Sequence, residues 1–302
     1  MRENEYYDTE GGIALTSDQG CPLEEWRSGT TSAKFALHES GFPVFLRPSE
    51  IEDRDEYGED DPYDVLDGSG EMTTFHQCRL AGTIHLLEEA TRHARTCPKI
   101  LDLGCGLGHI TAQIQRRFPF AEVSGLDGSI SAIAAAKKAY EGIDFVVADA
   151  YCPPYLPGYF DIVICNNIWE HVPDPLRLLE AVKRVLSPEG ILIISTPSRY
   201  RLGNIARVLI GKPVKLISPH HVTEYTVGQV IEQLRFGGFE AKVFNEPWRV
   251  AKSSGALKFA VRKVVRPLVQ GYLRMIGSHH SLGWTVFYIA QRRKLSRSLP
   301  DR

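Results

Sequence analysis

The hydrophobic and polar positions of this chain divide it into two kinds of region. From residue 1 to about residue 71 the pattern is irregular, and only Lys34–Leu46 (KFALHESGFPVFL) has two apolar runs that predict a β-hairpin, with its turn at ESG. From Thr73 onward, short apolar runs alternate with stretches of helical period. This alternation predicts an α/β domain in which helices cover both faces of a parallel sheet.

The elements follow from the two periods. The apolar runs that predict strands are Lys99–Leu103, Glu122–Leu126, Asp144–Ala148, Phe160–Cys165, Gly190–Thr196, Phe239–Phe244 and Trp284–Gln291. The stretches of helical period are Phe75–Ala94, Ile110–Phe118, Ser129–Tyr140, Pro175–Val185 and Thr226–Gly237. A seven-stranded sheet results if the last two strands pair with each other.

Charge is unevenly distributed along the 302 residues. Residues 1–75 hold 19 Asp and Glu against 5 Lys and Arg, whereas residues 249–302 hold 12 Lys and Arg against one acid, Asp301. We therefore predict four parts. They are an acidic N-terminal extension or cap with a β-hairpin (1–72), the core domain (73–247), a basic amphipathic helical insertion (248–283), and the last strand with a basic tail (284–302).

The basic insertion contains one long amphipathic pattern, 256–276. Apolar residues recur there at helical spacing, while Lys258, Arg262 and Arg266 fall on another face. Pro267 predicts a kink or interruption. Such a helix suits an anionic membrane surface, a cover over a binding pocket, or packing against the acidic N-terminal segment. An ordinary solvated surface helix gives the same pattern.

Composition excludes several classes of protein. No apolar run reaches the roughly 18 residues of a membrane-spanning helix, and the acidic start is unlike a secretory signal, so we predict a cytoplasmic protein, with peripheral membrane contact as an alternative. The six cysteines form no CxxC pair, which predicts reduced thiols. The net charge of −2 and the lack of an RNA-binding module argue against nucleic acid. The sequence does not predict the oligomeric state.

The first strand of the core leads into a glycine-rich turn, ILDLGCGLGHI (100–110). Gly104, Gly106 and Gly108 allow backbone to approach a ligand where a side chain would block it. The spacing is GxGxG rather than the GxGxxG typical of dinucleotide sites. Asp102 precedes the turn, and its carboxylate suits an ammonium group better than a pyrophosphate.

The next two strands also end in carboxylates. Asp127 (VSGLDGS) follows Gly104 by 23 positions, near the offset at which an acid binds ribose hydroxyls. Asp149 (FVVADA) ends the third strand. Because parallel strands share one carboxyl edge, the three carboxylates are expected to surround one nucleoside ligand.

These motifs together carry a family resemblance. LDLGCGLGH, GLDGS, VVADA and FDIVICNNIWEHVPDP resemble the motifs of class I methyltransferases that use S-adenosylmethionine (AdoMet), especially the ubiquinone and menaquinone branch. The resemblance extends from about Thr73 to Phe244. It implies a Rossmann-like doubly wound sheet of order 3-2-1-4-5-7-6 with strand 7 antiparallel, AdoMet as methyl donor, and S-adenosyl-L-homocysteine as product.

The resemblance also implies a role for each part of the site. It places the methionine end of AdoMet at Asp102, Gly104 and Asn166, the ribose at Asp127, and the adenine between the loops after the second and third strands. The predicted cofactor-binding residues are Asp102, Gly104, Cys105, Gly106, Asp127, Gly128, Ile130, Asp149, Ala150 and Asn166.

Two histidines are candidates for a general base. His171 (WEHVPDP) follows the fourth strand, and His221 (SPHHVTEYT) lies between the fifth strand and a helix. The alternative is that Glu170, His171 and the His220–His221 pair only stabilise their loops by hydrogen bonds. Related ubiquinone-pathway enzymes bind a metal through ExxEH, but Asn167 occupies the first position here, so we predict no metal site.

These observations predict an AdoMet-dependent methyltransferase that acts on a small-molecule or lipid-like acceptor, with oxygen favoured because histidines suit deprotonation of a hydroxyl. Two alternatives stay open. One is a non-catalytic AdoMet-binding scaffold protein. The other is an NAD-dependent enzyme of the same fold, against which the GxGxG spacing and Asp102 argue.

Overall fold

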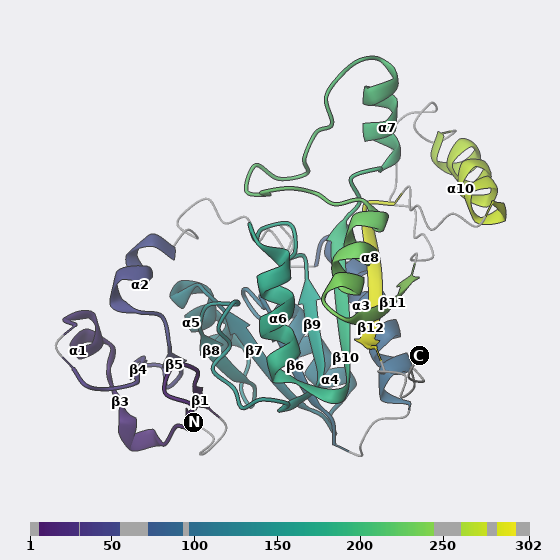
Figure 1. The fold of residues 1–302 in the computed structure, drawn as a ribbon. Coiled ribbons are helices and arrows are strands. Elements are labelled where there is room, and N and C mark those ends of the chain that lie inside the picture. Colours follow the sequence, from purple (N-terminus) through teal and green to yellow (C-terminus); the bar gives the residue numbers. More distant parts are fainter. Residues whose placement is uncertain are drawn as a thin grey trace, which may run out of the picture.

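The computed structural model describes residues 6–29, 31–54, 72–92, 97–244, 261–276 and 283–293. Its centre is a ten-stranded sheet of order β11-β12-β10-β9-β6-β7-β8-β5-β4-β3 (Figure 1). The bounds of the core strands are β6 Lys99–Leu103, β7 Glu122–Asp127, β8 Asp144–Val147, β9 Phe160–Asn166, β10 Leu186–Pro197, β11 Phe239–Phe244 and β12 Thr285–Arg292.

The seven core strands, numbered in chain order from β6, lie in the order 3-2-1-4-5-7-6, which is the order that the family resemblance implied. β12 is antiparallel to both of its neighbours, β10 and β11, while β6 to β10 are mutually parallel. The chain reverses its direction of winding between β6 and β9, so the carboxyl end of β6 is the topological switch point at which open α/β sheets bind ligands.

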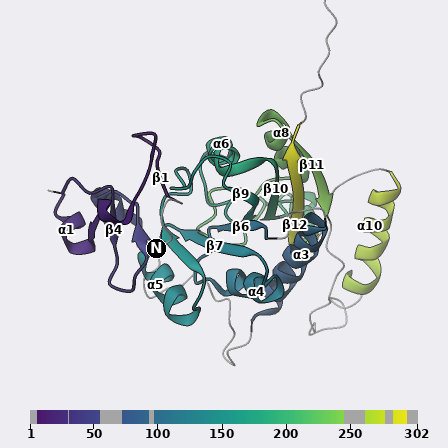
Figure 2. The same ribbon diagram turned by 90° about the horizontal axis from the view of Figure 1, so that it is seen from below.

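Helices cover both faces of the core sheet (Figure 2). α3 (Thr74–Thr91), α4 (His109–Arg117) and α5 (Ile130–Ala139) lie on one face, and α6 (Pro175–Val185) and α8 (Val227–Phe236) lie on the other. Local sequence fixes where several of them begin. The Asp174 carboxylate accepts hydrogen bonds from the first backbone N–H groups of α6, and Ser129 and Thr226 cap α5 and α8 in the same way.

The core consists of continuous aliphatic strands between these helices. Val163, Leu192 and Val230 belong to the cluster under α6 and α8, and Ile100 and Ile164 to the cluster under α3 and α4. Strands that are buried on both faces favour apolar residues, because few of their side chains reach water. This preference explains why the core strands are mostly apolar, with Asp102 and Asp127 only near their carboxyl ends.

The N-terminal extension does more than cap the core. Its β5 (Pro43–Val44) pairs in parallel with β8 through Val44 and Val147, and β4 (Phe35–Leu37) and β3 (Gly20–Pro22) continue the sheet. The predicted hairpin is confirmed, since β4 and β5 are antiparallel. The seven predicted strands are present, but three strands of the extension, which we expected to be otherwise irregular, add to the sheet. Strands of two or three residues are too short to produce a periodic pattern.

The remaining elements of the extension are short: β1 Tyr7–Asp8, β2 Ile13–Ala14, a 3-10 turn at Ser17–Gln19, α1 Leu23–Arg27 and α2 Pro48–Arg54. Tyr6 fixes this segment to the core. Its buried ring packs against Tyr155 with centroids 5.6 Å apart, and its hydroxyl donates a hydrogen bond to the Asp144 carboxylate at 2.8 Å. The extension is therefore packed against the β8 edge rather than lying apart from the core.

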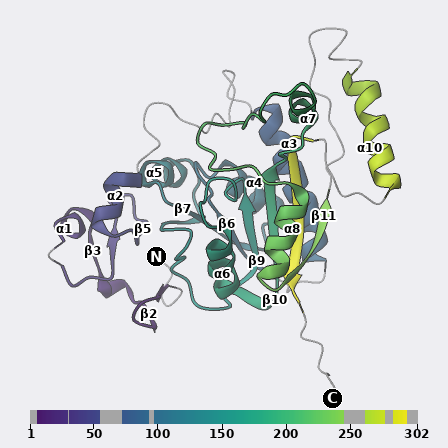
Figure 3. The same cartoon turned by 45° about the horizontal axis from the view of Figure 1, so that its top comes forward.

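Two helices stand at the upper end of the molecule (Figure 3). α7 (Leu202–Leu209) follows β10 and was not predicted. The basic insertion contains a π-helical turn (Val261–Val265) followed by α10 (Arg266–Met275), and this change of geometry falls beside Pro267, the predicted kink. The rest of the insertion lies outside the described residues. Among the described helices, none combines the length and apolar character needed to cross a bilayer.

Candidate functional site

The turn after β6 has a left-handed backbone that favours glycine at three positions. Gly104, Gly106 and Gly108 have φ values of 78°, 51° and 71°. A Cβ at Gly108 would lie 2.8 Å from the Phe145 ring, and a Cβ at Gly104 would lie 3.0 Å from Ile168. Both the left-handed conformation and the lack of space therefore require glycine here.

Asp102 ends its strand inside the protein and holds one polar partner. Its Oδ2 accepts a hydrogen bond from the Thr111 hydroxyl at 2.6 Å. Burial raises the pKa of Asp102 to about 6, and the Thr111 bond opposes this effect. A cation beside the carboxylate would restore its ionised form, so the position favours an ammonium ligand.

Asp127 connects the glycine turn to the loop after β7. Its Oδ2 accepts a hydrogen bond from the Gly106 N–H at 2.9 Å, and its Oδ1 accepts one from the Ser129 N–H at 3.0 Å. Burial raises the pKa of Asp127, while these backbone bonds lower it. Each carboxylate oxygen keeps a lone pair beyond these bonds, so Asp127 both shapes the turn and can accept further hydrogen bonds.

The other predicted cofactor residues lie along the same edge. Cys105 lies within the turn, where burial and the nearby carboxylates raise the pKa of its thiol well above the usual range. Gly128 and Ile130 begin the loop and helix after β7 and are half-buried, as is Ala150 after β8. These residues follow neighbouring strands, which brings them to one side of the sheet.

Asp149 lies at the far end of this edge. Its Oδ1 accepts a hydrogen bond from the Tyr151 N–H at 2.9 Å. It also lines a cavity of about 470 Å³ between the core and the N-terminal extension, whose walls include Tyr7, Trp26 and Phe45. The extension therefore forms part of the surroundings of Asp149, which the sequence did not predict.

Asn166, at the end of β9, has an unsatisfied donor. Its Oδ1 accepts hydrogen bonds from the Ser195 hydroxyl at 2.9 Å and the Thr83 hydroxyl at 3.2 Å, which fixes the amide. Its buried Nδ2 has no hydrogen-bond partner. An orphaned buried donor is costly unless a ligand satisfies it, and a carboxylate is a suitable acceptor.

The edge fits the two ends of an amino-acid ligand. Asp102 offers a carboxylate to an ammonium group, the Asn166 amide offers a free N–H to a carboxylate, and the glycine turn between their strands leaves room for backbone contact. AdoMet carries both groups on its methionine end. The residues that are present therefore fit the predicted methyl donor.

A second cluster lies in the loop that follows Asn166. Glu170, His171 and His221 each offer one atom that could bind a metal ion, and these three atoms lie within 4.8 Å of one another. The rings of His171 and His221 meet edge to face, with centroids 4.8 Å apart. The structure thus brings together two histidines that are 50 positions apart in the sequence, which sequence reasoning named separately.

Glu170 is fully buried, and the side chain of His221 is only 6% exposed. Oε1 of Glu170 accepts a hydrogen bond from the Asn167 amide at 2.9 Å, while its Oε2 has no partner. Burial raises the pKa of Glu170 to about 7. Its backbone carbonyl accepts from the Val222 N–H at 2.9 Å, which ties the two loops of the cluster together. Glu170 therefore combines the expected loop-stabilising role with a free carboxyl oxygen.

His171 is the least buried of the three, although its ring is partly shielded from water. Loss of hydration around its ring and the neighbouring His221 lower the pKa of His171 to about 4, although a hydrogen bond to the His220 carbonyl opposes the shift. The imidazole is therefore neutral near pH 7. A neutral imidazole can accept a proton or bind a metal, but this pKa makes it a weak base.

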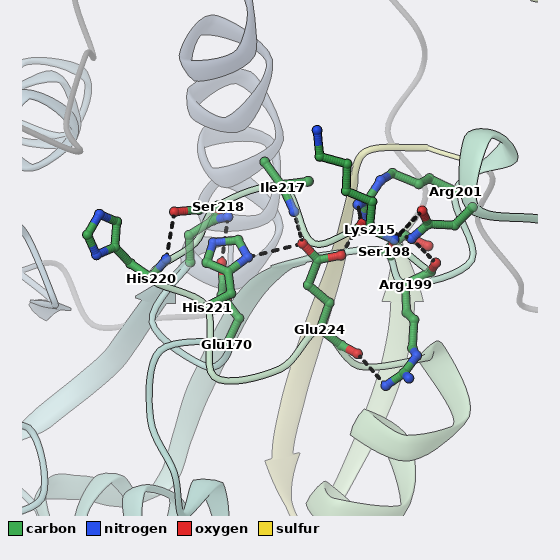
Figure 4. Close-up of polar contacts among 12 residues, drawn as sticks. Glu170, Ser198, Arg199, Arg201, Lys215, Ile217, Ser218, His220, His221 and Glu224 are labelled. Carbon is green, nitrogen blue, oxygen red and sulfur yellow. Dashed lines mark hydrogen bonds and ion pairs between the residues drawn. The ribbon is translucent and has the colours of Figure 1, made fainter. Parts of the chain in front are cut away.

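His221 is held by a buried carboxylate (Figure 4). Its Nδ1 lies 3.1 Å from Oε1 of Glu224, which also accepts the Ile217 N–H at 2.5 Å. Glu224 Oε2 forms an ion pair with Arg201, whose guanidinium also donates to the Ser198 and Lys215 carbonyls. These donors lower the pKa of Glu224, in spite of its burial. An ionised carboxylate only accepts, so His221 donates from Nδ1, and Nε2 is left as the basic nitrogen.

Asn167 explains how the loop turns after β9. It has φ 53°, a left-handed conformation that asparagine adopts more readily than glutamate does. The Ser195 hydroxyl, whose single proton is shared with Oδ1 of Asn166, lies 3.0 Å from Oδ1 of Asn167. Sequence reasoning used Asn167 only to argue against a metal, whereas the structure gives it a conformational role.

Sequence reasoning missed Glu224 and Arg201. They are 23 positions apart, and no local pattern links them, so only the folded chain reveals their ion pair. One feature of the sequence could have pointed to Glu224: it is the first acid after Glu189, and the segment between them contains five Lys and Arg residues that could pair with it. Trp169, in the loop after β9, belongs to the core: its ring is fully buried, and its Nε1–H donates to the Gln233 side-chain oxygen at 2.9 Å.

Comparisons with known proteins agree with the motifs. A family model described as "Methyltransferase domain" matches residues 101–194. The chain is 34% identical over 103 residues to a trans-aconitate 2-methyltransferase of Azoarcus sp. strain BH72, a match that covers 33% of this chain and 40% of that protein. It is 32% identical over 141 residues to a ubiquinone biosynthesis O-methyltransferase of Thiobacillus denitrificans, covering 45% of this chain and 60% of the relative.

Among solved structures, the chain is similar to the putative methyltransferase in a complex with the Trm112 methyltransferase activator of Haloferax volcanii. The TM-score is 0.48 at 19% sequence identity, with 71% of this chain and 94% of the other covered. The matched part of this chain spans only 40% and 60% of the length of the two relatives named above.

Proposed function

We propose that this chain, which carries a class I AdoMet-dependent methyltransferase domain, transfers the AdoMet methyl group to a hydroxyl of a small-molecule or lipid-like acceptor. One observation carries the proposal. The loop that contains Asn166, with its free amide N–H, continues directly into Glu170 and His171, to which the fold adds His221. A candidate donor site and a candidate base cluster therefore adjoin each other.

On the donor side, we infer that Asp102 binds the ammonium group and Asn166 the carboxylate of the methionine end. Asp127, which shapes the glycine turn through Gly106, accepts ribose hydroxyls, and Asp149 accepts from the adenine amino group. When bound, AdoMet supplies an electrophilic methyl group on a sulfonium, so the protein has only to orient the acceptor and remove its proton.

On the acceptor side, we infer that His221 is the general base. Glu224 holds its Nδ1–H, so Nε2 can take the hydroxyl proton while the acceptor oxygen bonds to the methyl carbon and the sulfur–methyl bond breaks. S-adenosyl-L-homocysteine and the methylated oxygen result, and the imidazolium returns its proton to solvent. His171, with a pKa of about 4, is better suited to hydrogen-bond the acceptor than to keep a proton.

A direct experiment uses AdoMet with an isotopically labelled methyl group, incubated with the full chain and a metabolite and lipid extract, and mass spectrometry of the products. We expect a labelled methyl ether. His221→Asn should lower its formation by about 100-fold or more, because a general base contributes roughly that factor. His220→Ala is the matched control, since His220 is adjacent and exposed, and it should retain activity.

Titration calorimetry separates the alternatives. AdoMet binding that Asp102→Asn weakens, without turnover of any acceptor, would favour the non-catalytic scaffold protein. Binding of NAD in place of AdoMet would favour the NAD-dependent enzyme of the same fold and contradict the proposal.

A second candidate mechanism rests on the free Oε2 of Glu170. Two imidazoles and a carboxylate within 4.8 Å could hold one divalent cation, with Glu224 orienting His221 and Asn167 orienting Glu170. A cation there would supply a Lewis acid to the acceptor hydroxyl. Cobalt(II) is the probe: visible absorption bands that His221→Asn abolishes and His220→Ala preserves would support this mechanism, and their absence in the unmodified chain would exclude it for that ion.

A further inference from the structure

The end of α7 exposes a row of large aliphatic side chains. Val208, Leu209 and Ile210 are consecutive, and Leu209 and Ile210 are 80% and 69% exposed. Gly211, with φ 72°, ends the helix directly after them, so the apolar row forms the tip of a projecting segment (Figure 1). Scattered exposed apolar residues are normal on soluble proteins, but three in succession at a projecting tip indicate a binding surface.

The segment of sequence that carries this tip has basic side chains and no acid. The sequence contains no Asp or Glu between Glu189 and Glu224. Arg207 precedes the apolar row, and the exposed Lys212 and Lys215 follow it. Solubility alone does not require charges of a single sign, whereas charges of a single sign attract an anionic partner.

α10 presents a second surface of the same kind. Leu268, Tyr272 and Met275 recur at helical spacing, and Leu268 and Met275 are 69% and 78% exposed. Lys263, in the preceding turn, is also exposed. Figures 1 and 3 both place α10 near α7 at the upper end of the molecule. Two apolar and cationic helices therefore stand at the same end.

We propose that the 207–215 tip and α10 together form a docking surface for an anionic lipid membrane. Aliphatic side chains enter the boundary between headgroups and acyl chains, while lysines and arginines pair with anionic headgroups. The absence of acids from the tip favours a negatively charged lipid surface over a protein partner, whose interface would carry charges of both signs. No helix has to span the bilayer, because both helices lie on it.

Hydrogen bonds and an ion pair connect the docking surface to His221, the candidate base. Asn204 of α7 is joined to Lys215 by two hydrogen bonds, at 3.1 and 3.2 Å, which closes the loop behind the tip. Arg201, immediately before α7, pairs with Glu224, which holds His221. Docking would thus bring the candidate acceptor site to the membrane surface. The docking itself needs no methyl transfer, so it goes beyond the proposed function and can fail separately from it.

The test is co-sedimentation of the full chain with vesicles. One set contains phosphatidylcholine alone, and the other contains about one third phosphatidylglycerol. We expect binding to the anionic vesicles that falls with added salt. Leu209→Asp/Ile210→Asp should weaken it by about tenfold or more, because two apolar contacts are lost and two repulsive charges are gained. Leu268→Asp should weaken it as well.

The matched control is Phe236→Asp, at the end of α8, because Phe236 is 80% exposed but lies outside the two helices. It should bind like the unmodified chain. Circular dichroism and AdoMet titration verify that each variant is folded. No binding to anionic vesicles, or unchanged binding by the double variant, would overturn the proposal. So would a homodimer in light scattering that the double variant disrupts, since the tip would then serve a second copy.

Discussion

Replacement of Glu224 by glutamine tests the buried network that holds His221. Glutamine has the same shape and keeps an acceptor oxygen for the Ile217 N–H, but it removes the charge opposite Arg201. The Glu224 and Arg201 side chains are 0% and 10% exposed, so the guanidinium would be left as an uncompensated buried cation. Breaking such a pair costs about 3–5 kcal/mol.

The lower end of that range applies, because Arg201 keeps hydrogen bonds to the Ser198 and Lys215 carbonyls. We therefore expect Glu224→Gln to lower the free energy of unfolding at pH 7 by about 3 kcal/mol. Urea denaturation followed by circular dichroism measures it. Glu232→Gln is the control, since its pair with Arg235 is exposed, and such pairs contribute about 0–1 kcal/mol.

The loss of stability in Glu224→Gln should also depend on pH. The folded-state pKa of Glu224 is lowered, so its contribution is fully present above the unfolded pKa of about 4.3 and is lost as the pH falls through the lower, folded value. The stability difference between the unmodified chain and Glu224→Gln should therefore shrink below about pH 4. Equal stabilities of Glu224→Gln and Glu232→Gln at pH 7, or a difference that does not shrink on acidification, would refute this account of the network.

Two further predictions concern single positions. The pKa of Glu170 is raised to about 7, so its ionisation destabilises the fold progressively between about pH 4.3 and 7. Glu170→Gln should therefore raise the free energy of unfolding by up to about 3 kcal/mol at pH 8 and hardly at all at pH 4. Urea titrations that show an equal gain at both pH values would contradict this. Gly108→Ala should cost about 3 kcal/mol, from a left-handed alanine and the 2.8 Å approach to Phe145. Gly142→Ala, with φ 80° but open space around it, should cost only about 1 kcal/mol, and thermal unfolding of both variants compares the two.

The sequence by itself determined the core strands, the helices between them and the strand ends that carry Asp102, Asp127 and Asp149. These features follow from local periodicity and from motifs within a few residues. Strands that helices cover on both faces bury most of their side chains, so mostly apolar runs reveal them. It also singled out His171 and His221. It missed α7, whose apolar residues stay exposed and form no buried stripe.

Only the tertiary structure decided which distant residues meet. The two-residue strand β5 joins β8 through Val44 and Val147, Glu224 pairs with Arg201, and His221 reaches Glu170 and His171. Such contacts depend on long-range chain closure and on burial, and burial is also what moves the pKa of Glu170 toward neutrality. None of these quantities is encoded in spacing along the chain, so they became visible only when the chain was folded.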